Sequence, residues 1–335
     1  MSFPVSYIIF FFTLILGTII SISSPSLFGA WVGLELNMMS FIPLITIKMN
    51  SYYSESALKY FLIQALSSAL FISSSLLSFT FLLISFILIF LALLLKLGSA
   101  PFHFWFPQVM EGLNWPQVFI LSTIQKLAPM ILLSYLMINN TLIKITLISS
   151  MASALFGALG GLNTMYLRKM IAFSSINHLS WMLIAISLSD IFWMFYFLIY
   201  SLILLSITSS LFSMQAFTLS SIAQLGTYST FNSLLMSSTF LSLGGLPPFT
   251  GFIPKWFMIQ IMMNMNLFVP LAILILSSLL TLYFYLRVVI MFIILSNPVM
   301  NFYLKYDSRS HNYSLPLKMF FNFLGVLLPV YLFLI

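Results

Sequence analysis

Charged residues are scarce in this chain, and their scarcity excludes most classes of soluble protein. Only 5% of the 335 residues are Asp, Glu, Lys or Arg, whereas 61% are hydrophobic. An ordinary globular domain carries about 25% charged residues, so this chain has too few to cover a water-facing surface. Apolar stretches of about 20 residues recur along the chain, and each is long enough to cross a bilayer core. The composition predicts an all-α, polytopic membrane protein.

Cysteine is absent, which excludes disulfides, thiolate metal sites and cysteine-ligated iron–sulfur clusters on this chain. The sequence also has no phosphate-binding loop, dinucleotide fingerprint or metal-ligand spacing. The net charge of +7 comes from scattered basic residues without a run, so nucleic acid is not an expected partner. The apolar N-terminal segment lacks a basic leader and a small-residue cleavage site, which predicts a first transmembrane helix rather than a signal peptide.

Clusters of Gly, Pro, Ser and Asn divide the apolar runs into about eleven predicted transmembrane helices. We expect these helices at residues 3–22, 26–46, 56–78, 80–110, 116–138, 143–161, 166–188, 191–214, 230–264, 268–296 and 315–335. Basic residues such as Lys48, Arg168 and Lys169 gather in the even-numbered connections. By the positive-inside rule, the N-terminus then lies on the cytoplasmic or matrix side and the C-terminus on the opposite side.

The fourth and ninth predicted helices are interrupted by similar segments. These are "LGSAPFHFWFP", which begins at Leu97, and "GGLPPFTGFIP", which begins at Gly244. They align at a constant spacing of 147 residues, with Gly98 over Gly245. The second interrupted helix comes five helices after the first, and an odd displacement inverts the second copy in the membrane. Paired Gly/Pro interruptions of this kind are typical of inverted-repeat transporters; chance similarity in an apolar background is the alternative.

The repeat predicts three parts of the chain. A first five-helix repeat covers 1–140 and contains the broken helix 80–110. A second, inverted five-helix repeat covers 141–296 and contains the broken helix 230–264. Residues 297–335 form a loop and a C-terminal transmembrane helix.

Each proline in the interruptions removes one N–H group and frees the carbonyl four residues earlier. The carbonyls concerned are those of Leu97, His103, Leu243, Gly244 and Thr250. Unpaired backbone of this kind survives in a membrane only when it is buried in protein or lines a wet cavity.

Five ionisable residues lie deep in the predicted membrane segments: Glu35, Lys96, Lys126, His178 and Lys255. An ionised group at the bilayer centre costs at least ~2.5–3.5 kcal/mol, and such residues are usually functional. Burial disfavours the charged form of a lysine, whereas a nearby carboxylate favours it. Movement of Glu35 relative to Lys96 would therefore switch Lys96 between holding and releasing a proton. His178 is suited to relay protons, with Lys126 as an intermediate group and Lys255 on the exit side.

Simpler roles for these residues remain open. Glu35 and Lys96 would also fit an ion pair that joins two helices. Lys126 and Lys255 would also fit lysines that extend toward an interface, and His178 a hydrogen-bonded core histidine.

Two further residues are candidates of second rank. Lys59 lies near a helix end, where a solvated role competes with an interior one, and His103 lies within the first interruption.

Several motifs together resemble a known family. "GAWVGLELNMMSFIPL", "LLLKLGSAPFHFWFPQVMEGL", "QKLAPM", "GALGGLNTMYLRKMIAFSSINHLSWML" and "LSLGGLPPFTGFIPKW" are similar to the chain 2 family of mitochondrial NADH–ubiquinone oxidoreductase, respiratory complex I, in its arthropod form. The resemblance covers about residues 15 to 290. It implies an antiporter-like membrane-arm subunit with two inverted five-helix repeats and a polar axis at mid-membrane.

The resemblance also implies roles for individual residues. The family's second-helix glutamate corresponds to Glu35, its broken-helix lysine to Lys96 and its following-helix lysine to Lys126. Its distal broken-helix lysine corresponds to Lys255, and the histidine of its "SSI-H-W" stretch to His178.

The function implied is that of a core complex I subunit in the mitochondrial inner membrane. It would help to couple NADH-to-ubiquinone electron transfer to proton translocation, with the N-terminus in the matrix and the C-terminus in the intermembrane space. Flavin, iron–sulfur clusters and quinone are expected on other subunits. Expected partners are other membrane-arm subunits, membrane lipids (cardiolipin is a candidate), protons and internal waters. A free-standing cation/proton antiporter and a structural spacer that moves no proton are the alternatives.

Overall fold

The structure is a computed structural model that describes residues 5–46, 50–137, 139–224 and 230–295. Lys48, the predicted loop at 297–314 and the predicted helix at 315–335 lie outside the described residues. The C-terminal part predicted at 297–335 is therefore not described either.

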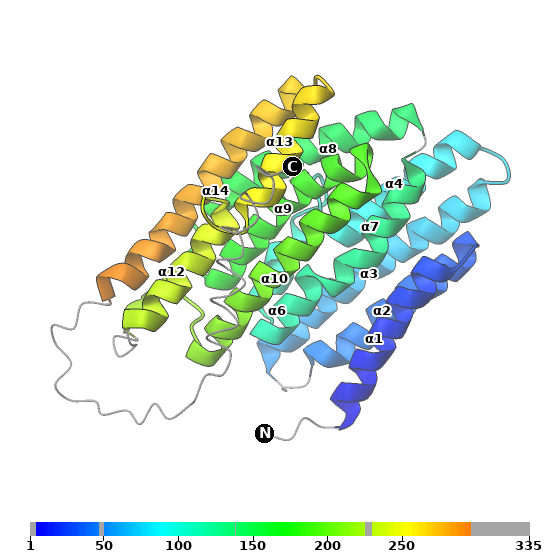
Figure 1. Cartoon of the computed structure of the whole chain (residues 1–335). Helices are drawn as coiled ribbons and strands as arrows, with labels where there is room; N and C mark the ends of the chain where they lie inside the picture. Colours follow the sequence, from blue (N-terminus) through cyan, green and yellow to red (C-terminus); the bar gives the residue numbers. More distant parts are fainter. Residues whose placement is uncertain (1–4, 47–49, 138, 225–229, 296–335) are drawn as a thin grey trace. The chain divides into compact units, whose positions relative to one another are not determined.

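The described part of the chain is built of fourteen α-helices (Figure 1). Their bounds are α1 Val5–Ser23, α2 Leu27–Ile45, α3 Ser51–Leu77, α4 Leu82–Leu97, α5 Trp105–Glu111, α6 Trp115–Ser122, α7 Ile124–Leu136, α8 Asn140–Gly161, α9 Leu167–Leu188, α10 Asp190–Met214, α11 Leu219–Gln224, α12 Thr230–Gly244, α13 Phe252–Asn264 and α14 Phe268–Leu295.

Eight spans in the described residues are long and apolar enough to cross a membrane. The all-α, multi-pass fold predicted from composition is thereby confirmed. The count of eleven helices stays a prediction.

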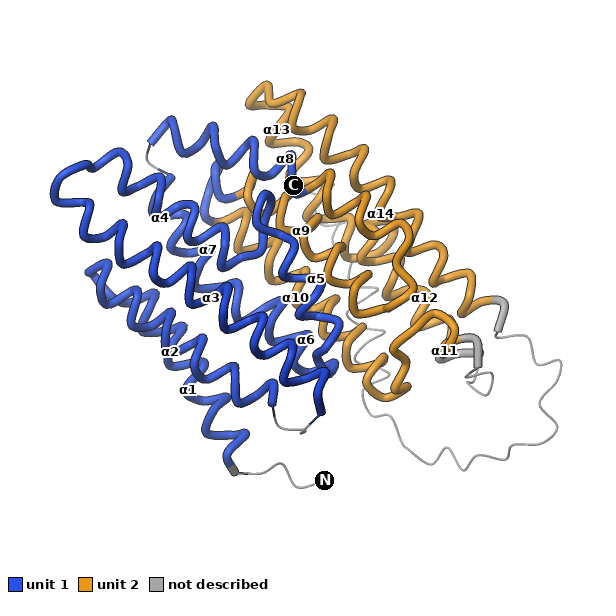
Figure 2. Tube along the Cα trace, turned by 180° about the vertical axis from the view of Figure 1, so that it is seen from behind, with its two compact units in different colours: residues 1–153, 186–190 blue, residues 154–185, 191–335 orange. Residues whose placement is uncertain are grey.

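The chain divides into two compact units (Figure 2). Unit 1 comprises residues 1–153 and 186–190, and unit 2 comprises residues 154–185 and 191–335. The first change from one unit to the other occurs within α8, and residues 186–190, where α9 ends and α10 begins, belong to unit 1. The part boundaries predicted at 140 and 296 stay predictions.

In unit 1, α1 and α2 pack with their backbones close together. A Cβ atom on Gly17 would lie 2.8 Å from the backbone nitrogen of Asn37, and one on Gly33 would overlap the backbone of Ser21. Small residues permit such contacts between membrane helices, whose association depends on close packing. Gly17 and Gly33 are therefore packing residues.

Unit 2 contains a matching helix pair. A Cβ atom on Gly157 of α8 would lie 2.8 Å from the backbone nitrogen of Asn177 on α9. This is the distance that a Cβ atom on Gly17 would have from the backbone nitrogen of Asn37. Gly157 and Asn177 each follow their counterparts by 140 residues. The two units thus present an asparagine at the same place in the same kind of helix pair.

Both predicted interruptions are present. α4 is followed by Gly98 with φ +68°, and α12 is followed by Gly245 with φ +75°. Glycine adopts this left-handed conformation without the steric cost that a side chain brings, and it commonly ends helices in this way.

The turns after the two glycines also match. The amide of Phe102 donates to the carbonyl of Ser99 over 2.8 Å, and the amide of Phe249 donates to the carbonyl of Leu246 over 2.9 Å. Both pairs are related by the same spacing of 147 residues. The similarity of the two interruptions therefore extends from sequence to backbone hydrogen bonding.

The helix predicted at 116–138 is interrupted, which the sequence analysis missed. Thr123 separates α6 from α7 with φ −120° and ψ −80°, and its hydroxyl donates to the carbonyl of Phe119 over 2.6 Å. Hydroxyl side chains compete with the helical backbone for carbonyl groups, and Pro129 withholds an N–H one turn later. This interruption contains no Gly or Pro at its centre, so composition did not reveal it.

Close packing of α1 on α2 gives a first testable prediction. Gly33→Ala should destabilise the detergent-solubilised protein by about 1–3 kcal/mol, the usual cost of overpacking, because the new methyl overlaps the Ser21 backbone. Thermal denaturation measures the effect. Gly244→Ala is the control, since a Cβ atom there would have its nearest contact at 3.6 Å. Equal stability of the two variants would contradict this account of the packing.

Candidate functional site

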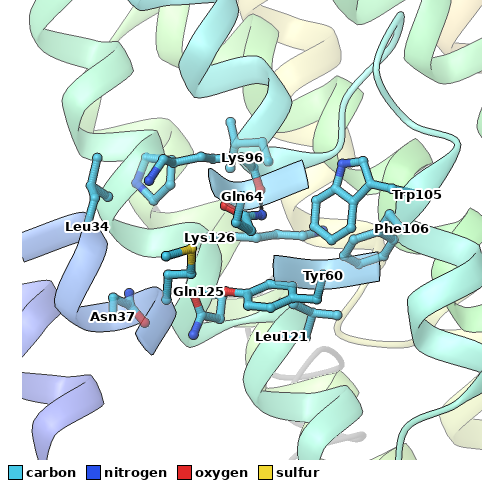
Figure 3. A pocket seen from close by; sticks show the side chains of 13 residues that line it. Leu34, Asn37, Tyr60, Gln64, Lys96, Trp105, Phe106, Leu121, Gln125 and Lys126 are labelled. Atoms are coloured by element: carbon cyan, nitrogen blue, oxygen red, sulfur yellow. Dashed lines mark hydrogen bonds between the residues drawn. The ribbon is translucent and has the colours of Figure 1, made fainter. Parts of the chain in front are cut away.

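Unit 1 contains a small cavity that is lined by side chains of α2 to α7 (Figure 3). It has room for about one water molecule. Two lysines, Lys96 and Lys126, line it together, and the uncharged polar side chains on it are Asn37, Tyr60, Gln64 and Gln125. Two of the predicted site residues thus share one chamber.

Lys96 lies in the last turn of α4 and is 7% exposed. Its carbonyl accepts a hydrogen bond from Gln64 Nε2 over 3.4 Å, and the neighbouring carbonyl of Leu95 accepts from Trp105 Nε1 over 3.1 Å. Side chains of α3 and α5 therefore bind the carbonyl end of α4. These bonds hold Lys96 at the interruption.

Lys126 lies one turn after the interruption at Thr123 and is only 2% exposed. Its Nζ atom lies 4.7 Å from the centre of the Phe106 ring, which is within the range of a cation–π contact. Among the described residues Nζ has no hydrogen-bond partner. The interpretation of Lys126 as a lysine that extends to an interface is therefore not what the structure shows.

Glu35 is half-buried on α2. Its predicted partner is Lys96 on α4. Within the described part of the chain the two groups form no direct ion pair, and Oε2 of Glu35 is buried without a hydrogen-bond partner. The simpler reading, an ion pair in contact, is thus not observed.

Unit 2 holds the other two principal candidates. Lys255 on α13 is 6% exposed, and its Nζ donates to the carbonyl of Gly244 over 2.8 Å. This carbonyl is one of those predicted to be freed by proline. Gly245 permits the contact, because a Cβ atom there would lie 3.0 Å from Nζ of Lys255.

Two of the other carbonyls that were predicted to be free accept backbone hydrogen bonds instead. The carbonyl of His103 accepts from the amide of Phe106, and that of Thr250 accepts from the amide of Ile253, each over 3.2 Å. The prediction that these two are free was wrong. The chain turns tightly enough after each for the amide three residues later to replace the lost donor.

His178 on α9 faces a second small cavity and contacts two tyrosines of α10. Its Nδ1 lies 3.0 Å from the hydroxyl of Tyr196, and its ring centre lies 5.0 Å from that of Tyr200. Leu243 and Pro254 line the same cavity, and they adjoin the residues of the Lys255–Gly244 bond. His178 is thus placed near the second interruption.

The second-rank candidates lie elsewhere. Lys59 forms an ion pair with Glu55 over 2.6 Å, and both side chains are more than one-third exposed. His103 is buried, with its ring 4.1 Å from that of Phe104, but it does not line the unit 1 cavity. Neither residue joins Lys96 and Lys126.

The sequence analysis missed the uncharged polar partners. Asn37, Gln125 and Tyr60 line the unit 1 cavity, and Tyr196 and Tyr200 contact His178. A search for charge cannot find such residues. Amides inside apolar helices were the available signal, because an amide in hydrocarbon needs a hydrogen-bond partner.

No group of three His, Cys, Asp or Glu side chains in the described ranges could hold a metal ion. The two units offer lysine, histidine, tyrosine and amide groups instead. The lysine and histidine side chains can bind and release protons, and the tyrosine and amide groups can donate and accept hydrogen bonds.

Comparison with known proteins identifies the family. The family model "NADH:quinone oxidoreductase/Mrp antiporter, TM" matches residues 24–281. The NADH-ubiquinone oxidoreductase chain 2 of Anopheles gambiae is 46% identical over 333 residues, which cover 95% of this chain and 94% of the relative. That of Aedes aegypti is 43% identical and covers 98% of each chain.

Solved structures show the same fold at lower identity. A chain of respiratory complex I from Thermus thermophilus aligns with a TM-score of 0.77 and 23% identity, over 88% of this chain and 77% of that one. A chain of the Mrp complex from Dietzia aligns with a TM-score of 0.72 and 15% identity, over 82% and 58%. Taken with the sequence matches, these findings show that the chain belongs to the NADH:quinone oxidoreductase/Mrp antiporter membrane family and, within it, to the NADH-ubiquinone oxidoreductase chain 2 proteins.

Proposed function

We propose that this chain is a core membrane-arm subunit of respiratory complex I and takes part in proton translocation. Its family membership supports this function. The observation that carries the proposal is Lys126, a lysine that is 2% exposed, has no hydrogen-bond partner in the described part of the chain, and shares a cavity with Lys96. A cation is kept in such a place at a considerable free-energy cost, which indicates use rather than stabilisation.

In unit 1, Glu35 biases the protonation of Lys96. A carboxylate near a lysine favours the charged amine, and its withdrawal favours release of the proton. A released proton can pass to Lys126 because both lysines line one cavity. An N–H bond of Lys96 breaks and an N–H bond of Lys126 forms, so the charge of the cavity does not change.

In unit 2, Lys255 and His178 are the proton-holding groups. Lys255 donates to the Gly244 carbonyl, and the bond holds the amine at the interruption whether the amine is charged or neutral. His178 exchanges a proton through its ring nitrogens, and the hydroxyl of Tyr196, 3.0 Å from Nδ1, orients the ring.

The proposal includes the architecture in full. The chain would contain two five-helix repeats of opposite orientation, followed by a C-terminal helix. The matched interruptions and the matched Gly–Asn helix contacts support two copies of one unit, and the odd displacement between the two interrupted helices supports their inversion. Parts at 1–140, 141–296 and 297–335 belong to this proposal.

The cellular setting follows from the relatives. We infer a location in the mitochondrial inner membrane, with the N-terminus in the matrix and the C-terminus in the intermembrane space. Other membrane-arm subunits, lipids and internal waters would be the partners. Flavin, iron–sulfur clusters and quinone would be held by other subunits. For cysteine-ligated clusters, the lack of cysteine in this chain supports this assignment.

The two alternatives fit the unit 1 cavity less well. A free-standing antiporter for a metal cation needs several oxygen ligands around that cation, whereas two lysines line this chamber. A spacer that moves no proton has no use for buried lysines that apolar residues would replace at lower cost.

Replacing Lys126 tests the proposal. Lys126→Met should lower the rate of coupled NADH oxidation about 100-fold. This is the smallest effect usually seen when a positioned acid–base group is lost. The measurements are the rate of NADH oxidation and the number of protons moved per NADH oxidised, both by the assembled enzyme in vesicles. Lys144→Met is the control, because Lys144 is exposed on α8. An unchanged proton-to-electron ratio in Lys126→Met would support the spacer instead.

A second prediction concerns His178. Tyr196→Phe removes the hydroxyl that lies 3.0 Å from Nδ1 but keeps the ring. Coupled turnover should fall about tenfold, which corresponds to one hydrogen bond of ~1.4 kcal/mol. The same assay applies, with Tyr283→Phe as control because Tyr283 is 61% exposed. Full activity of Tyr196→Phe would show that the tyrosine does not orient His178.

A further inference from the structure

Three buried polar atoms around the unit 1 cavity lack hydrogen-bond partners among the described residues. They are Oδ1 of Asn37, Nε2 of Gln125 and Nζ of Lys126. Asn37 and Lys126 are each 2% exposed. Buried polar atoms in native proteins nearly always have a partner, either protein or ordered water. The unpartnered atoms of three side chains from two helices therefore point to a ligand in this chamber.

The orientation of Gln125 is determined by Tyr60. The hydroxyl of Tyr60 donates to Oε1 of Gln125 over 3.3 Å. The acceptor end of the Gln125 amide is thereby engaged, which leaves the donor end, Nε2, for the cavity. Figure 3 shows Asn37, Gln125, Tyr60 and the two lysines around the same space.

The equivalent asparagine in unit 2 indicates what Asn37 requires. Oδ1 of Asn177 accepts a hydrogen bond from Ser277 Oγ over 3.1 Å, and Nδ2 of Asn177 donates to Thr281 Oγ1 over 3.4 Å. Both partners are hydroxyl groups of α14. In unit 1, Asn37 instead lines a cavity together with Gln125 and Lys126 of α7, and this cavity has room for about one water molecule. A water molecule there could donate to Oδ1 of Asn37, as the hydroxyl of Ser277 donates to Oδ1 of Asn177.

We propose that the unit 1 cavity binds one water molecule between Asn37 and Gln125, and that these two amides are positioning residues for proton transfer between Lys96 and Lys126. The water accepts a hydrogen bond from Gln125 Nε2 and donates one to Asn37 Oδ1. The water keeps one lone pair, which can accept from a protonated lysine, and one hydrogen, which it can donate to a neutral lysine. The site therefore suits a pair of lysines of which one is protonated and the other neutral. This inference rests on the proposed function.

The transfer step is balanced. The protonated lysine gives one hydrogen to the water oxygen, so that an N–H bond breaks and an O–H bond forms. The water gives its remaining hydrogen to the neutral lysine, so that an O–H bond breaks and an N–H bond forms. The water is regenerated, and one positive charge has moved between the two amines. Without the amides, the water would lack the orientation that places its lone pair on one lysine and its hydrogen on the other.

The test uses apolar replacements of similar size in the assembled enzyme in vesicles. Asn37→Leu and Gln125→Met should each lower coupled turnover about tenfold while Lys96 and Lys126 remain in place. Gln117→Met is the matched control: Gln117 is also buried, but its amide donates to the backbone carbonyls of Leu44 and Ile45 and does not line the cavity. It should lower assembly or thermal stability and leave the coupled turnover of the assembled enzyme unchanged.

The outcomes separate this inference from the proposed function. If Lys96→Met and Lys126→Met abolish proton translocation while both amide variants translocate normally, the water site is wrong and the proposed function stands. If the lysine variants also translocate normally, both proposals are wrong.

A second measurement applies if an amide variant fails to assemble. A high-resolution map of the unmodified assembled enzyme should show density for one water within hydrogen-bonding distance of Asn37 and Gln125. A cavity without that density would overturn the inference.

Discussion

A helix that ends inside a membrane leaves its last carbonyl groups without partners, and this constraint organises both units. Lipid cannot supply hydrogen bonds, so protein or water must do so. In unit 1 the side chains of Gln64 and Trp105 bind the carbonyl end of α4. In unit 2 the ammonium group of Lys255 binds the carbonyl end of α12. In unit 2 a lysine on which the proposed function depends is thus also the partner of the broken backbone.

The lysines at these interruptions are positioned by different means. Lys255 is a direct partner of the backbone, and Gly245 gives it room. Lys96 precedes its interruption, and Lys126 follows a separate one at Thr123. In unit 1 the backbone is satisfied by neutral side chains, which leaves the lysine amines available for proton exchange.

Much of the fold could be predicted from periodicity and composition. Apolar runs bounded by Gly, Pro and Asn placed most helices within a few residues of their observed bounds, because membrane spans are long and their ends are polar. The carbonyl of Gly244 could be predicted as a hydrogen-bond acceptor, since proline removes its usual donor. The interruption at Thr123 could not, because it depends on a hydroxyl that competes with the backbone.

The candidate site was predictable only for its charged members. A lysine deep in an apolar run is visible in sequence, whereas the use of an amide or a tyrosine depends on what folding brings near it. Asn37 and Asn177 illustrate this limit: both are buried asparagines in similar helix contacts, yet only Asn177 meets hydroxyl groups of another helix.

The different surroundings of these two asparagines bear on directionality. If the two inverted repeats were identical, a proton path through them would look the same from both sides of the membrane. Such a path would give protons no preferred direction. Here one copy ties its asparagine to serine and threonine, which makes a stiff crosslink between α9 and α14. The other copy presents its asparagine to an enclosed space beside two lysines. Such divergence between duplicates places the proton-holding groups of the two halves in surroundings of different rigidity, so the path is not the same from its two ends.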